Sequence, residues 1–71
     1  MKNNKIQIYI NGKKKLVNTN NSLYQILKLF KLNKKFIAIE VNRQVVPKSL
    51  YKSKIVFEND AIEVVEFIGG G

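Results

Sequence analysis

The first apolar residues of the chain follow the two-residue period of a half-buried β-strand. Ile6, Ile8 and Ile10 alternate with Gln7 and Tyr9, and side chains spaced in this way lie on one face of a strand. Asn11-Gly12 comes next, and both residues accept the positive φ angles of a tight type I′ turn. The following residues, 13–17, are predicted to return as a second strand. The chain therefore begins with a β-hairpin whose apolar face has to be covered by another element.

A single amphipathic helix is predicted to provide that cover. Ser22 and Gln25 have the spacing of a capping box, in which each side chain bonds to the backbone N–H of the other residue. The apolar residues recur at the spacing of one helical face: Leu23, Ile26, Leu27 and Phe30. Asn33 is predicted to take the left-handed conformation just beyond the helix. Lysines at its end favour the negative pole of the helix dipole, and an anion site is the alternative interpretation: Lys28, Lys31, Lys34 and Lys35.

The second half of the chain reads as further strands joined by turns. Residues 36–41 are nearly all apolar, which is typical of a strand buried on most of both faces. Leu50 and Tyr51 are the predicted anchors of an irregular segment, and Asn59 is predicted to adopt a left-handed conformation. The pattern predicts, in order, a turn over 42–44, an irregular segment over 48–54, a short strand over 55–57, a turn over 58–60 and a last strand over 62–68.

This order of elements predicts an α+β fold. A mixed sheet of four to five strands with one main helix on one face suits a chain of this length, and the order is that of a β-grasp, or ubiquitin-like, roll. In such a roll the last strand lies centrally beside the first. We expect residues 1–68 to form a single domain and residues 69–71 to form a flexible tail.

The composition excludes most catalytic chemistry. The chain has no cysteine and no histidine, and its five acidic residues are scattered. It therefore lacks a disulfide framework, a thiolate ligand, a cysteine nucleophile and the commonest general base. We expect no catalytic residue, no metal site and no bound cofactor, so that the protein acts with a partner and is not an enzyme by itself.

The net charge of +8 suggests a polyanionic partner, but it has a simpler explanation. Lysine, asparagine and isoleucine dominate the chain, and AT-rich codons encode all three. Arg43 is the only arginine, whereas nucleic-acid readers favour the bidentate fork of arginine. Tyr9 beside Lys13-Lys14-Lys15 is the one candidate for a basic surface with an aromatic residue, and an edge strand kept from pairing explains this lysine run as well. A nucleic-acid-binding module is therefore the disfavoured alternative.

No stretch of the sequence is apolar for long enough to span a bilayer. We expect no membrane partner and a reducing compartment. The cytoplasm is the default, with an organelle stroma as the alternative if an AT-rich plastid genome encodes the chain.

Three glycines, Gly69-Gly70-Gly71, follow the last apolar strand directly. Glycine reaches backbone angles closed to other residues and lets another backbone approach closely. A tail of this kind can thread a narrow channel and present the carboxylate of Gly71 in a partner's active site. This carboxylate is the one group of the chain in an unusual chemical position.

Several segments together resemble the ThiS family of sulfur carriers in thiazole (thiamine) biosynthesis. Residues 39–47 resemble the family's strand, turn and Val-Pro segment, and Tyr51 stands where the family usually has an aromatic residue. Residues 58–65 resemble its Asp-Gly-Asp turn and the following strand, with Asn59 in place of the glycine. The terminal glycines match those of the family, although some members have two.

The resemblance implies a mechanism that starts at Gly71. A ThiF-like adenylating enzyme would use ATP and magnesium to adenylate the Gly71 carboxylate, and sulfur from a persulfide donor would convert it to a thiocarboxylate. A ThiG-like thiazole synthase would accept that sulfur. Gly70 and, less strictly, Gly69 would give the tail its conformational freedom. The alternative within the same chemistry is a MoaD-like carrier for molybdopterin synthesis or tRNA thiolation.

A docking surface for these partners is expected on the face of the sheet that the helix leaves open. Val65 and Phe67 alternate with Ile62, Val64 and Ile68, so they belong on that face, close to the tail. The alternative is that they cover a small cluster with Tyr51 or Tyr9. Arg43, in the turn at residues 42–44, is a candidate for a contact at the rim of the surface.

Overall fold

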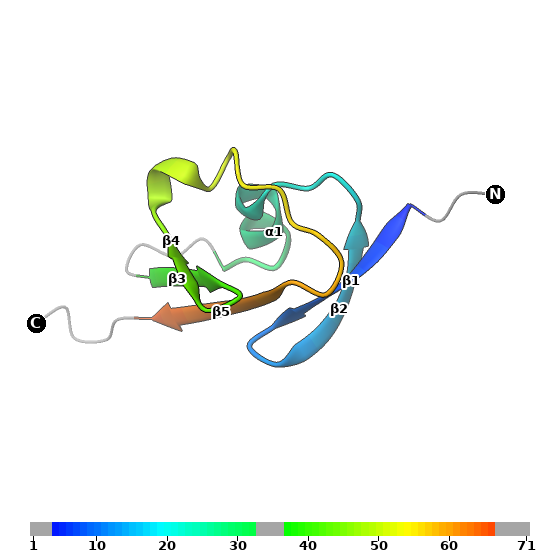
Figure 1. The fold of residues 1–71 in the computed structure, drawn as a ribbon, viewed down its shortest axis with the longest axis horizontal. Coiled ribbons are helices and arrows are strands. Elements are labelled where there is room, and N and C mark those ends of the chain that lie inside the picture. The colour runs from blue at the N-terminus through cyan, green and yellow to red at the C-terminus, as the bar shows by residue number, and fades with distance from the viewer. Residues whose placement is uncertain (1–3, 33–36, 67–71) are drawn as a thin grey trace, which may run out of the picture.

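One helix packs on a five-stranded mixed sheet (Figure 1). The computed structural model describes residues 4–32 and 37–66. The elements in chain order are β1 (Lys5–Ile10), β2 (Lys13–Asn18), α1 (Leu23–Leu29), β3 (Ile37–Val41), β4 (Gln44–Val46), the 3-10 helix η1 (Lys48–Leu50) and β5 (Ala61–Glu66). The expected α+β class is confirmed. The predicted boundary between domain and tail, at residues 68 and 69, lies outside the described residues.

The strands lie in the order β2-β1-β5-β3-β4. β1 and β5 are parallel, and the other neighbours are antiparallel. The last strand therefore lies between the first strand and β3, which is the arrangement expected for a β-grasp roll. β2 is one edge of the sheet, and Lys13 and Lys14 are exposed on it, as expected for a strand that resists pairing with another chain.

The core lies between α1 and one face of the sheet. Leu23, Ile26 and Leu27 are buried on the helix, as predicted, and Phe30 packs against the core while remaining partly exposed. The buried side chains from the strands and the loops are Ile8, Ile10, Val17, Ile37, Ile39, Val41, Val46, Tyr51, Val56 and Ile62. The prediction that β3 is buried on most of both faces is confirmed for one face, where Ile37, Ile39 and Val41 are buried, whereas Ala38 and Glu40 on the other face are partly buried. The helix covers a single face of the sheet, so β3 shows simple alternation.

The predicted capping box begins helix α1. The Ser22 Oγ accepts a hydrogen bond from the Gln25 backbone N–H at 3.1 Å, and the Ser22 N–H donates to the Gln25 Oε1 at 2.8 Å. The next two N–H groups of the helix donate to the loop that follows η1. These bonds join Leu23 to the Lys54 carbonyl at 2.7 Å and Tyr24 to the Tyr51 carbonyl at 3.0 Å. The start of the helix is therefore tied to a segment that is distant in the sequence.

The end of α1 differs from the prediction. The helix ends at Leu29, and Lys31 is the left-handed residue that follows it, with φ of 58°. Asn33, for which the sequence predicts this conformation, lies outside the described residues. The Lys31 N–H donates to the Lys28 carbonyl at 3.1 Å and the Leu32 N–H donates to the Leu27 carbonyl at 2.7 Å. This is a Schellman motif. Leu32 packs against the core, and this hydrophobic contact ends the helix earlier than the asparagine suggested.

Replacement of Lys31 by glycine should stabilise the domain. A side chain in the left-handed region costs roughly 1–2 kcal/mol, and the greater freedom of glycine in the unfolded chain offsets part of that gain. We expect K31G to raise the free energy of unfolding by about 1 kcal/mol in urea denaturation. The control K28G, inside the last helical turn, should lower it by about 1 kcal/mol. Destabilisation by K31G would contradict this prediction, because it would mean that contacts of the Lys31 side chain stabilise the helix end by more than its positive φ costs.

The predicted tight turns are confirmed. Asn11 and Gly12 have φ of 49° and 82°, as a type I′ turn requires. The turn predicted over 42–44 is a two-residue turn of Asn42 and Arg43, with φ of 52° and 69°, because Gln44 already pairs with Val41 as the first residue of β4. Asn59 has φ of 68°, so it takes the left-handed position that the sequence assigned to it.

The segment between η1 and β5 is the part of the described chain that the sequence predicted least well. Residues 55–57 form no strand, and Ile55 makes a single β-bridge with Ser22. The Val56 N–H donates to the Asn21 carbonyl at 2.9 Å, so this backbone lies against the start of α1 and not at a sheet edge. Tyr51 is buried as predicted, but Leu50 is half-exposed and is not an anchor.

Candidate functional site

Strand β5 carries the chain to its glycine tail, so the site is built on this strand. β5 pairs with β3 along its length, from Val41 opposite Ile62 to Ile37 opposite Glu66. On its other side it pairs with β1 over Tyr9 and Ile10. The tail residues, Gly69, Gly70 and Gly71, lie outside the described part of the chain, as does Phe67. The described structure therefore fixes the strand from which the tail continues.

The side chain of Asn42 holds the beginning of β5. Its Nδ2 donates to the Asp60 Oδ1 at 2.9 Å, and its Oδ1 accepts from the Ala61 N–H at 2.9 Å. The other carboxylate oxygen of Asp60 accepts from the Phe57 N–H at 2.8 Å. These bonds join the β3–β4 turn to the turn that precedes β5, and they set the point at which the last strand begins.

A second asparagine holds the middle of β5. The Asn11 N–H donates to the Ile62 carbonyl at 2.9 Å, and the Asn11 Oδ1 accepts from the Val64 N–H at 2.8 Å. The side chain thus continues the ladder where β1 has ended. The sequence predicted Asn11 as a turn residue only. Its contact with β5 was missed, because nothing local connects residues this far apart in the chain.

The outer face of the sheet, away from α1, carries Val65. Ile62 is buried and Val64 packs against the core, whereas Val65 is 47% exposed and lies opposite Ala38 on β3. Val65 therefore lies on the open face, as the alternation predicted, and does not join the core. Its role in binding a partner stays a prediction.

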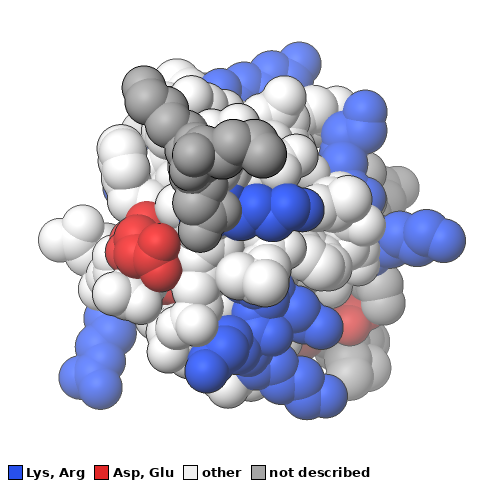
Figure 2. Space-filling model, turned by 90° about the vertical axis from the view of Figure 1, so that its right-hand side faces the viewer, with Lys and Arg blue, Asp and Glu red and all other residues white. Residues whose placement is uncertain are grey.

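Two acidic residues lie near Val65 on the outer face. Glu63 lies two residues before Val65 on the same face of β5 and directly opposite Glu40 of β3. Like charges in this position destabilise a sheet. Figure 2 shows basic side chains spread over the side of the molecule where β1 begins, with few acidic ones among them. A partner that docks beside Val65 therefore meets two acidic side chains on a chain whose net charge is +8.

Arg43 lies at the other end of the β3–β5 pair. It follows Asn42 in the turn beside Asp60 and Ala61, whereas Val65 pairs with Ala38, roughly 10 Å back along β3. The structure does not bring Arg43 and Val65 together. Any contact that Arg43 makes with a partner would involve the region where β5 begins, away from the tail.

The titratable side chains form no cluster at this site. Among residues 4–32 and 37–66, no group of three or more His, Cys, Asp or Glu side chains could hold a metal ion. Burial raises the pKa of the Tyr51 phenol above its usual 10.0, so Tyr51 stays protonated at neutral pH as part of the core. No described helix has the length and hydropathy needed to cross a membrane.

Comparisons with known proteins agree on one family. The family model "ThiS family" matches residues 2–71. The uncharacterized protein ycf40 of Porphyra purpurea is 34% identical over 71 residues, which are 100% of both chains. The sulfur carrier protein ThiS of Bacillus subtilis is 29% identical over 65 residues, covering 90% of this chain and 98% of the carrier.

A thiazole synthase and a solved structure complete the comparison. The thiazole synthase of Paramagnetospirillum magneticum is 32% identical over 66 residues, which are 93% of this chain but 20% of the synthase. The crystal structure of the thiamine biosynthesis protein ThiS from Geobacter metallireducens superimposes with a TM-score of 0.82 at 25% identity. The match covers 93% of this chain and 100% of that structure.

Proposed function

Since the chain belongs to the ThiS family of small sulfur carriers, which are related to thiamine biosynthesis and are not enzymes, we propose that it carries sulfur on the carboxylate of Gly71. The proposal requires that the mature protein ends at this residue. Gly69 and Gly70 allow the tail to enter the active sites of its partners, because they have no side chain.

The chemistry takes place at the Gly71 carboxyl carbon. A ThiF-like adenylating enzyme with ATP and magnesium joins a Gly71 carboxylate oxygen to the α-phosphorus of ATP and releases pyrophosphate. The terminal sulfur of a persulfide donor then attacks the acyl carbon, and AMP leaves. A thiol cleaves the sulfur–sulfur bond of the resulting acyl disulfide, is itself oxidised, and releases the thiocarboxylate. The ThiS-like chain supplies only the carboxylate and the surfaces that position it.

The observation that carries the proposal is the position of β5. This strand is central, it is held by Asn11 and Asn42, and Gly71 lies five residues beyond its last residue, Glu66. Five extended residues reach about 17 Å at most. A rigid exit point with a tail of this reach suits delivery of a carboxylate into a partner's cleft.

A ThiG-like thiazole synthase is the proposed sulfur acceptor. In Paramagnetospirillum magneticum, a segment similar to nearly all of this chain is one fifth of a thiazole synthase. Carrier-like and synthase portions in one polypeptide support their working together. The named relatives favour thiazole formation over molybdopterin synthesis or tRNA thiolation. The compartment, cytoplasm or an organelle stroma, stays a prediction from the sequence.

Mass spectrometry of the C-terminal peptide tests the proposal. The full chain is incubated with ATP, magnesium, a ThiF-like enzyme and a persulfide donor. We expect one oxygen of the Gly71 carboxylate to be replaced by sulfur, only when ATP is present. The ThiS of Bacillus subtilis serves as the positive control. Conversion of that carrier under conditions that leave this chain unchanged would contradict the proposal.

Replacement of Val65 by alanine should weaken binding to the adenylating enzyme or the synthase. Loss of buried apolar surface in a contact costs about 1–2 kcal/mol, so we expect roughly tenfold weaker binding in a titration. Stability in urea should change little, because Val65 is exposed. The predicted contact residue Phe67 should behave in the same way.

The control for Val65 is Leu16→Ala. Leu16 is exposed on the same face of the sheet but on edge strand β2, two strands away from β5. We expect this variant to bind as the unchanged protein does. Equal weakening by both variants would mean that binding does not depend on the surface next to the tail.

A further inference from the structure

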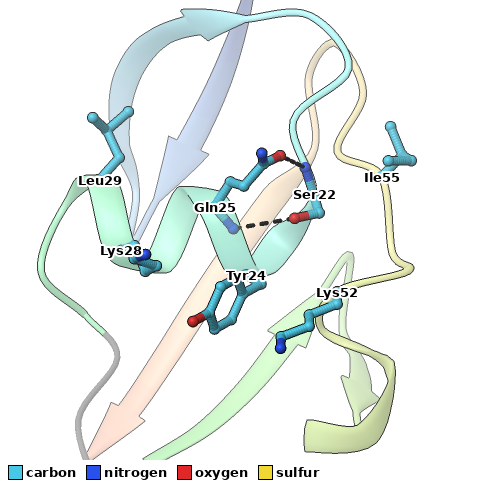
Figure 3. A pocket seen from close by; sticks show the side chains of 7 residues that line it. All are labelled: Ser22, Tyr24, Gln25, Lys28, Leu29, Lys52 and Ile55. Atoms are coloured by element: carbon cyan, nitrogen blue, oxygen red, sulfur yellow. Dashed lines mark hydrogen bonds between the residues drawn. The ribbon is translucent and has the colours of Figure 1, made fainter.

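A groove lies on the helical side of the molecule, opposite the face that carries Val65. It has a volume of about 660 Å³ and runs between α1 and the loop after η1 (Figure 3). Tyr24 and Lys28 line it from the helix, and Lys52 and Ile55 line it from the loop. The groove is separate from β5 and from the proposed sulfur chemistry.

Two lysines hold their ammonium groups over one aromatic ring in this groove. The Lys28 Nζ lies 5.5 Å from the centre of the Tyr24 ring, and the Lys52 Nζ lies 5.0 Å from it. Figure 3 shows the ring between the two side chains. The hydrogen bond from the Tyr24 N–H to the Tyr51 carbonyl, at 3.0 Å, ties the Lys52 loop to the helix. The two cations are therefore brought together by the fold and not by the local sequence.

The side chains around the ring offer hydrogen-bond donors to a ligand. None of the residues that line the groove is acidic. Gln25 uses its Oε1 to accept from the Ser22 N–H, so its amide NH₂ is the group it can still offer. Cation–π contacts hold each ammonium group by roughly 0.5–1 kcal/mol at an exposed site, while the two like charges repel each other. An anion bound between them would relieve that repulsion.

The groove also has an apolar side chain at each end (Figure 3). Leu29 is 61% exposed at one end, and the partly buried Ile55 lies on the loop. Cationic and apolar groups side by side suit a ligand that carries carboxylates next to aliphatic side chains. They do not suit single-stranded nucleic acid, which needs a free aromatic face for stacking, because both lysines lie over the Tyr24 ring.

We propose that the groove at Tyr24, Lys28 and Lys52 docks an acidic, leucine-containing segment of a partner protein. Glu or Asp carboxylates of that segment pair with the two lysines, and its aliphatic side chains pack on Leu29 at one end of the groove and on Ile55 at the other (Figure 3). Because the groove faces away from Val65, the segment binds while the tail is engaged elsewhere. The partner holds the body of the protein without covering the tail.

The test uses the full chain and a fluorescein-labelled synthetic peptide in which Glu and Leu alternate. Fluorescence anisotropy measures the dissociation constant of the peptide. We expect K28Q/K52Q to weaken binding about tenfold, because two ion pairs are lost. The matched control K13Q/K14Q removes the same charge from edge strand β2 and should change binding less than twofold. Both variants are checked for unchanged unfolding in urea.

Three outcomes would overturn the proposal. The first is that the unchanged protein shows no saturable binding of the peptide. The second is equal weakening by K28Q/K52Q and K13Q/K14Q, which would mean general attraction to a basic protein. The third is tighter binding of a single-stranded RNA that K28Q/K52Q abolishes. Deletion of Gly71 should leave peptide binding unchanged. Failure of the groove proposal can therefore be distinguished from failure of the proposed sulfur transfer.

Discussion

Deletion of Gly71 is expected to abolish sulfur transfer while leaving the domain folded. The shortened chain still ends in a glycine carboxylate, but that carboxylate lies about 3.5 Å short of its former reach. A displacement of about 1 Å in an active site can cost a hundredfold in rate, so we expect a loss of at least that size. Thiocarboxylate formation with ATP and a persulfide donor measures the effect.

Two comparisons make the Gly71 result specific. Gly71→Ala keeps the carboxylate in place and adds only a Cβ, so it should retain more activity than the deletion. The urea midpoint of the deleted chain should equal that of the full chain, because the deletion removes no side chain. A deleted chain that still supports thiazole formation in a complementation assay would refute the role of Gly71.

Replacement of Ile39 by alanine is expected to remove much of the stability of the domain. Ile39 is fully buried at the centre of β3, opposite Val46 of β4 and Val64 of β5. A truncation of this kind costs about 2–5 kcal/mol, and a domain of this length has only about 4–11 kcal/mol in total. Urea denaturation should show the loss as a large shift of the midpoint.

The control for Ile39 is Val45→Ala on the neighbouring strand β4. Val45 is 68% exposed on the outer face, so its truncation should change the free energy of unfolding by less than about 0.5 kcal/mol. A loss below 1 kcal/mol for Ile39→Ala would mean that the core closes around the missing atoms. Sulfur transfer by Ile39→Ala should fall only as far as the folded fraction falls.

The features that the sequence predicted well depend on residues close together in the chain. Alternation of Ile6, Ile8 and Ile10 indicated β1, and the positive φ of Asn11 and Gly12 followed from their chemistry. The capping box of Ser22 and Gln25 involves residues three apart. Each of these preferences acts within one turn or one strand, so the local sequence contains the whole cause.

The errors occur where distant packing competes with a local preference. Helix α1 ends at Leu29 and the left-handed conformation falls at Lys31, because the partly buried Leu32 packs against the core; Asn33, the predicted position, lies outside the described part of the chain. Residues 55–57 have the composition of a strand, but their backbone bonds to the start of α1. In both cases a tertiary contact stabilises the observed conformation by more than the local propensity of a few residues favours the predicted one.

The sequence alone determined the opening hairpin, the helix and the last strand, the composition that removes catalytic side chains, and the glycines that follow the last strand. These properties belong to single residues or to short patterns. Only the tertiary structure decided how Asn11 and Asn42 hold β5, that Arg43 lies apart from Val65, and that Lys28 and Lys52 share the ring of Tyr24. The physical reason is that such contacts join residues far apart in the chain, and chain folding alone brings them within bonding distance.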